Sequence, residues 1–117
     1  MITETHKYTI DPDIAVVQIK GRLHLGNLLA AVEDSLKKLI RDGGRKLVID
    51  LEGLDYIDSA GIGMLISCYG DMDAAGGEFR VAGTQGRVAK TFGLAKVERL
   101  LSFDADVAAS CAAFGKG

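Results

Sequence analysis

An amphipathic helical segment between two short apolar runs is the feature of this sequence that most restricts its fold. Residues 14–19 are mostly aliphatic, as expected of a strand covered on both faces. Apolar side chains then recur at helical spacing, at Leu29, Val32, Leu36, Leu39 and Ile40. The next run, residues 46–51, is short, apolar and β-branched. Tight turns join the three segments, so the pattern predicts a βαβ crossover with parallel strands.

The rest of the chain continues this alternation of strands and helices. Residues 2–10 predict a strand that forms a hairpin with residues 14–19 through a turn at residues 11–13. We expect Asn27 to cap the first helix and Asp104 to cap the last. Between them we predict a helix from Ser59, a strand at 78–83, a helix at 86–93 closed by Gly93, a further turn or two, and a strand at 101–103. The fold class is therefore α/β, a single domain over residues 1–117 with a mixed central sheet of about four to five strands and about four helices.

The charged residues, the apolar runs and the cysteines argue against several functional classes. The chain has 14 basic and 16 acidic side chains and no basic block, so it lacks the electrostatic footprint of a nucleic-acid binder. No apolar run approaches the roughly 20 residues that cross a bilayer. Cys68 and Cys111 stand at neither disulfide-framework nor metal-site spacing. We expect a cytoplasmic protein without metal or cofactor that binds neither nucleic acid nor membranes directly.

Enzyme signatures are weak. No phosphate-binding GxxxxGK[ST] loop is present, and Ser59 lies in no GxSxG turn, although Ser59, His24 and Asp55 can be drawn as a hydrolytic triad. A phosphoaspartate receiver using Asp50 would need an acidic cluster beside it, whereas residues 11–13 should lie at the other end of the sheet. We therefore predict that the protein is not an enzyme.

The most informative stretch is residues 55–63. It places Ser59 at the first turn of a helix, followed by Gly61 and Gly63, each costing about 1 kcal/mol relative to alanine in a helix interior. A serine at a helix N-terminus suits a phosphate, which the free backbone N–H groups and the helix dipole accommodate. On one interpretation the glycines let a partner or a kinase approach Ser59. On the other, Ser59 merely caps the helix and the glycines let two elements of this chain pack closely.

Residues 58–63, Asp-Ser-Ala-Gly-Ile-Gly, resemble the motif of the STAS domain family, specifically the bacterial anti-sigma factor antagonists. The resemblance extends over nearly the whole chain and includes the strand at 47–51, a Gly-x-Leu loop at 21–23 and a late helix ending in Phe-Gly-Leu. It implies a STAS-like domain and a partner switch. In such proteins the unphosphorylated domain binds an anti-sigma factor, often a GHKL-type serine kinase, and the sigma factor is released. Phosphorylation of the motif serine ends binding, and a PP2C-type phosphatase restores it.

The resemblance assigns Ser59 as the phosphorylated residue. We expect the protein to be a monomer or a weak dimer. The implied partner-binding residues are Asp58, Ser59, Ala60, Gly61 and Gly63, with weaker assignments in residues 21–27 and 83–87, among them Leu23, His24, Asn27, Gly83 and Thr84. Many relatives carry aspartate where this chain has His24, so the role of that loop stays open. The alternative implied by the family is a scaffold or transport-linked STAS subunit in which Ser59 is rarely modified.

Overall fold

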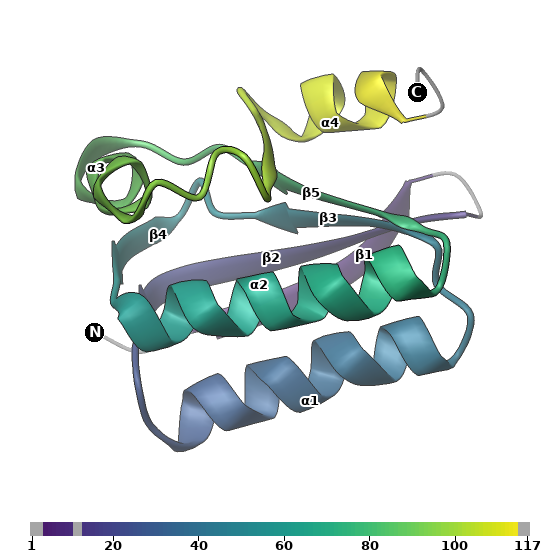
Figure 1. The fold of residues 1–117 in the computed structure, drawn as a ribbon, viewed down its shortest axis with the longest axis horizontal. Coiled ribbons are helices and arrows are strands. Elements are labelled where there is room, and N and C mark those ends of the chain that lie inside the picture. The colour runs from purple at the N-terminus through teal and green to yellow at the C-terminus, as the bar shows by residue number, and fades with distance from the viewer. Residues whose placement is uncertain (1–3, 11–12, 115–117) are drawn as a thin grey trace.

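A computed structural model of the chain describes residues 4–10 and 13–114. Within these ranges six strands form one mixed sheet and four helices cover it (Figure 1). The strands are β1 (Glu4–Ile10), β2 (Ile14–Leu23), β3 (Lys46–Asp50), β4 (Leu54–Ile57), β5 (Glu78–Ala82) and β6 (Ser102–Asp104). The helices are α1 (Asn27–Arg41), α2 (Ser59–Ala74), α3 (Gly86–Ala95) and α4 (Val107–Ala113). No helix in the described part of the chain has the length and apolar character that a membrane span requires.

The sheet order confirms the predicted crossover. Its main path is β1-β2-β3-β5-β6, in which β1 is antiparallel to β2 and all later neighbours are parallel. Helix α1 connects β2 to the parallel strand β3, as the helical segment between two apolar runs predicts. The predicted α/β class with a mixed sheet is confirmed.

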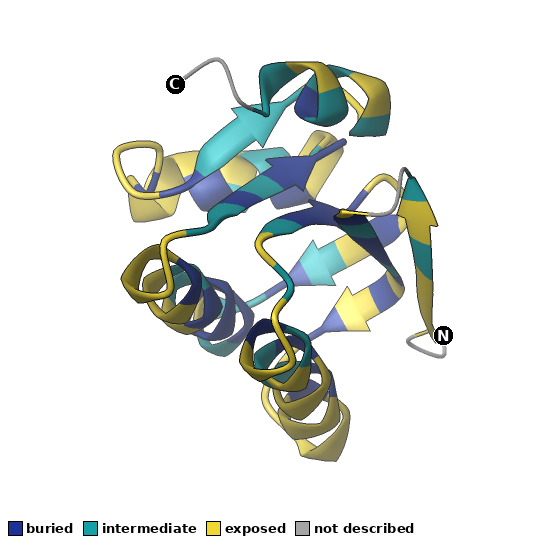
Figure 2. Cartoon of the chain, turned by 90° about the vertical axis from the view of Figure 1, so that its right-hand side faces the viewer, coloured by how far each residue is buried: buried dark blue, intermediate teal, exposed yellow. Residues whose placement is uncertain are grey.

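Helices cover the two faces of the sheet unequally. Helices α1 and α2 lie side by side against one face and enclose the main core, which includes Val17 and Ile19 of β2 (Figure 1). Helix α4 packs on the opposite face, where Ile14 and Val16 belong to a second, smaller core. Strand β2 is therefore covered on both faces, as expected from its continuous apolar run. In Figure 2 the buried central strands contrast with the exposed outer sides of the helices.

The sixth strand is one more than the sequence predicts. Strand β2 continues to Leu23, with a register shift between Gly21 and Arg22, and this continuation pairs with β4. No strand is predicted at residues 54–57, because four residues are too few to show a strand period. Their pairing with the end of β2 brings the residue after β4, Asp58, next to the loop after β2.

Three predicted helix ends are wrong. Asn27 is the first residue of α1 rather than its cap, because Gly26 occupies the capping position. Helix α3 runs past Gly93 to Ala95 and is closed by Lys96 in the left-handed conformation (φ 57°). Helix α4 is capped by Asp106 rather than Asp104. The expected start of the first strand at Ile2 and most of the hairpin turn, Asp11 and Pro12, lie outside the described residues.

Candidate functional site

Helix α2 begins at Ser59, and Asp58 caps it. The Gly61 backbone N–H donates to Asp58 Oδ1 at 2.9 Å. The other carboxylate oxygen, Oδ2, accepts from the Leu25 backbone N–H at 3.0 Å. The Asp58 N–H in turn donates to the Leu23 carbonyl oxygen at 3.2 Å. Asp58 thus joins the start of α2 to the loop between β2 and α1.

These contacts keep Asp58 ionised. Partial burial acts to raise the pKa of its carboxyl group, but the N–H donors of Leu25 and Gly61 and the nearby His24 outweigh that effect. The net result is a pKa below the usual aspartate value. A fixed negative charge therefore stands next to Ser59 at neutral pH.

Ser59 itself is exposed at the first position of the helix. Asp58 already supplies the side-chain cap, and among the described residues no hydrogen bond involves the Ser59 hydroxyl group. The interpretation of Ser59 as the helix cap is therefore wrong. Its Oγ is accessible to a reacting partner without unfolding of the helix.

The two unusual glycines of α2 differ in their surroundings. Gly61 is buried, and a Cβ atom there would stand 2.9 Å from the Leu23 carbonyl oxygen and 2.7 Å from Ile57 Cγ1. The close approach at Gly61 is therefore made by this chain, between the start of α2 and the end of β2. Gly63 is exposed, with open space where a Cβ atom would lie. Of these two glycines, Gly63 is the one that leaves room for an external partner.

The remaining predicted residues near the motif lie at the same end of the molecule. Leu23 is buried at the end of β2, and its carbonyl accepts from Asp58. His24 is exposed, with its ring 6.4 Å from that of Tyr56. Asn27 and Ala60 belong to the first turns of α1 and α2, and both helices start at the left end of Figure 1.

Gly83 and Thr84 make their described contacts with residues other than Ser59 and Asp58. Gly83 is buried with φ +76°, and a Cβ atom there would lie 3.1 Å from the Glu52 backbone nitrogen. Thr84 is half-buried and lines a hollow of about 180 Å³ with Phe92 and Phe103. The described contacts connect this loop to the turn before β4, not to Ser59.

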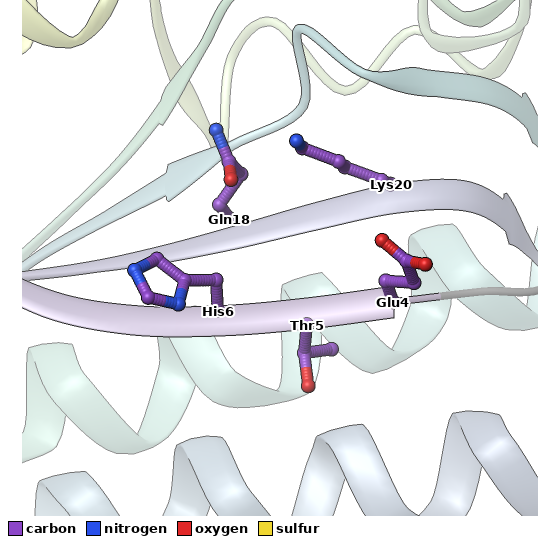
Figure 3. Close-up of a pocket in the computed structure, with 5 residues that line it drawn as sticks. All are labelled: Glu4, Thr5, His6, Gln18 and Lys20. Atoms are coloured by element: carbon purple, nitrogen blue, oxygen red, sulfur yellow. The ribbon is translucent and has the colours of Figure 1, made fainter.

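Two of the larger hollows have linings that do not include Ser59. One, of about 600 Å³, lies against β1 and β2. Figure 3 shows Glu4, His6, Gln18 and Lys20 on one side of these strands, with Thr5 pointing to the other side. The other, of about 540 Å³, lies between β4 and the start of α3 and is lined by residues that include Arg22, Asp55 and Arg87. Neither includes Ser59 or Asp58 in its lining.

The enzyme alternatives find no support in the geometry. In the described part of the chain no hydrogen bond joins His24 to Ser59 or Asp55; the His24 Nδ1 atom lies 3.2 Å from the Leu25 carbonyl oxygen instead. Asp50 ends β3, whereas Asp13 pairs with Lys46 at the start of that strand, so the acids that a receiver needs together are at opposite ends. Across residues 4–10 and 13–114, no group of three or more His, Cys, Asp or Glu could hold a metal ion.

Leu25 lies in the predicted range 21–27 without being named individually, and Leu28 lies outside every predicted range. Their side chains are 76% and 56% exposed, unusual for leucine, and they stand at the loop and first turn beside Asp58. The sequence gives no separate signal for Leu28, because helical spacing places it beside Leu39 at the edge of the apolar stripe.

Comparisons with known proteins give a family and a fold. The STAS domain model matches residues 6–110. An anti-sigma factor antagonist from Mycobacterium paratuberculosis superposes with a TM-score of 0.82 at 20% identity, over 96% of this chain and 93% of that one. The phosphorylated form of the Bacillus cell fate determinant SpoIIAA gives 0.69 at 14%, over 87% and 92%. A sulfate transporter family protein from Wolinella succinogenes gives 0.68 at 16%, over 90% and 87%. At these identities the likeness shows a shared fold.

Proposed function

The chain belongs to the STAS domain family, and we propose that it is an anti-sigma factor antagonist that switches partners through phosphorylation of Ser59. The unphosphorylated domain binds an anti-sigma factor that is also a GHKL-type serine kinase, and the sigma factor is released. The family match and the single sheet support one STAS domain over residues 1–117. The protein acts in the cytoplasm as a binding module and a substrate, without a catalytic activity of its own.

The observation that carries the proposal is that Ser59 is exposed at the N-terminus of α2, where Asp58 rather than the Ser59 hydroxyl group caps the helix. The kinase transfers the γ-phosphoryl group of ATP to Ser59 Oγ. The Oγ atom forms the new O–P bond and loses its proton, and ADP is released. A PP2C-type phosphatase hydrolyses that bond. The phosphate brings roughly −1.5 to −2 charges next to the ionised Asp58. Repulsion and desolvation at this surface end partner binding.

The surface around Ser59 supports this mechanism. No charged residue occurs between Asp58 and Asp71, so the exposed part of α2 near Ser59 is uncharged. A partner that packs on this part of α2 meets no cation of the helix that could balance an added phosphate. Desolvation of the dianion would therefore weaken the complex.

The test is to incubate the domain with its cognate kinase and ATP and to locate the phosphate by mass spectrometry. Ser67 supplies a matched control on the same helix, because it is exposed and its hydroxyl oxygen accepts from Lys37 Nζ at 2.8 Å. We expect Ser59→Ala to abolish phosphorylation and keep binding, Ser59→Asp to weaken binding, and Ser67→Ala to change neither. Phosphate found only at another residue contradicts the proposal.

A second candidate is a scaffold or transport-linked STAS subunit, favoured by the likeness to the sulfate transporter family protein. Light scattering separates the two. A stable high-order particle supports the scaffold, whereas a monomer or weak dimer supports the switch.

A further inference from the structure

Asp58 uses its two carboxylate oxygens for two different elements. Oδ1 accepts from Gly61 N–H within α2, and Oδ2 accepts from Leu25 N–H in the loop after β2. We call residues 24–26 the Leu25 loop. Because one carboxylate makes both bonds, the position of Leu25 depends on the residue immediately before Ser59.

The Leu25 loop leads into an apolar, uncharged surface. The Leu25 and Leu28 side chains are 76% and 56% exposed. No charged residue occurs between Leu25 and Glu33, and α1 has no acidic residue in its first turn. Helices α1 and α2 pack together and start at the same end of the molecule (Figure 1). Leu25 and the start of α1 therefore offer an apolar contact to a partner beside the charged Asp58.

We propose that Leu25 is an apolar anchor for the anti-sigma factor and that Asp58 is a positioning residue that holds the Leu25 loop in its binding conformation. The inference rests on the proposed function and adds a second route for the switch. A dianion on Ser59 repels the Asp58 carboxylate and competes for the N–H groups at the start of α2. The bond to Leu25 N–H weakens, and the anchor loses its fixed position.

The first experiment needs no partner. The exchange of the Leu25 amide proton with water is measured by NMR in the wild type and in the Ser59→Asp and Asp58→Asn variants. Asparagine keeps one accepting oxygen for the cap, but its NH₂ group cannot accept from Leu25. We expect at least a threefold faster exchange of the Leu25 amide in both variants. Unchanged exchange in both variants overturns the positioning role.

The second experiment measures binding to the purified anti-sigma factor that phosphorylates Ser59, by calorimetry with the full chain. We expect Leu25→Ala to lower the affinity about tenfold, as for a central apolar anchor. Leu94→Ala is the matched control, since Leu94 is 74% exposed on α3. It should bind within twofold of the wild type. An equal loss in both variants overturns the anchor.

A double-mutant cycle shows whether Asp58 acts through Leu25. If it does, Asp58→Asn weakens binding about as much as Leu25→Ala, and the double variant is no weaker than either single variant. Additive losses overturn the positioning role and indicate a direct contact of Asp58 with the partner. Wild-type binding and Ser59 phosphorylation, measured in parallel, separate the two hypotheses. If both occur while Leu25→Ala binds normally, the inference fails and the proposed function stands; if neither occurs, both fail.

Discussion

At the residue scale, Gly61 and Gly63 lie two residues apart in the same helix and have different physical roles. Both lie in the first two turns of α2, where glycine costs helix stability. At Gly61 the Leu23 carbonyl and the Ile57 side chain occupy the space of a Cβ atom. Gly63 has no such neighbour, so the lack of a side chain there fits an external contact better than an internal one.

The two glycines therefore respond oppositely to alanine. We expect Gly63→Ala to raise the free energy of unfolding by up to about 1 kcal/mol, the helix-propensity gain. Gly61→Ala should lower it by about 1–3 kcal/mol, as typical of overpacking against fixed backbone. Urea denaturation of both variants measures the difference. A Gly61→Ala variant as stable as Gly63→Ala contradicts the close approach between α2 and β2.

At the element scale, the charge of Asp58 makes the start of α2 sensitive to pH. The folded-state pKa of Asp58 is lowered, so its ionised cap contributes stability above the unfolded carboxyl pKa of about 4. That contribution is lost as the pH falls through the lower, folded pKa. Asp58→Asn retains a capping oxygen and does not titrate there.

We expect the wild type to be more stable than Asp58→Asn at pH 7 and the difference to shrink as the pH falls below about 4. Urea unfolding of both proteins between pH 3 and pH 7 measures it. Other titrating groups are common to both proteins and cancel in the comparison. A difference that stays constant across this range contradicts the lowered pKa of Asp58.

Helix α4 is attached to the sheet by a polar cluster around Asp104, the last residue of β6. Asp104 accepts from Arg80 Nε and from the buried Ser110 hydroxyl, each at 2.7 Å. Partial burial acts to raise the Asp104 pKa, but these donors lower it overall.

Ser110→Ala removes the hydrogen bond from α4 to a charged group, so we expect a loss of about 1.5–3 kcal/mol in unfolding free energy. Ser35→Ala, at an exposed position of α1, should change it by less than about 0.5 kcal/mol. Urea denaturation of the two variants and the wild type measures both changes in unfolding free energy. Equal stability of the two would show that the Ser110 bond contributes nothing.

The elements that could be predicted from the sequence are those with a local signal. The apolar stripe of α1 and the aliphatic run of β2 are long enough to show their periods, and Ser59 follows a capping aspartate. Strand β4 has no such signal, because its pairing depends on a register shift in β2. The second bond of Asp58, to Leu25, joins residues far apart in the sequence and follows only from that pairing. The helix start and Ser59 could therefore be predicted from a local signal, whereas the bond that ties Leu25 to Asp58 could not.

At the scale of the whole molecule, Ser59 lies outside both cores. Helix α2 is held by buried residues further along, among them Ile62, Leu65 and Cys68, where burial raises the thiol pKa to about 12. We therefore expect a charge at Ser59 to alter a surface and one loop without changing the packing of the sheet and helices.

We expect Ser59→Asp to change the free energy of unfolding by less than about 0.5 kcal/mol. The helix dipole favours the new charge by about 0.3–1 kcal/mol, and repulsion from Asp58 opposes it by a similar amount. Urea denaturation measures the stability, and amide NMR shifts locate the change, which should be confined to residues 23–26 and 58–63. Gly61→Ala is the positive control for disturbed packing. Shift changes that spread to α4, on the opposite face of the sheet, would show that the charge acts by altering the core rather than the partner surface.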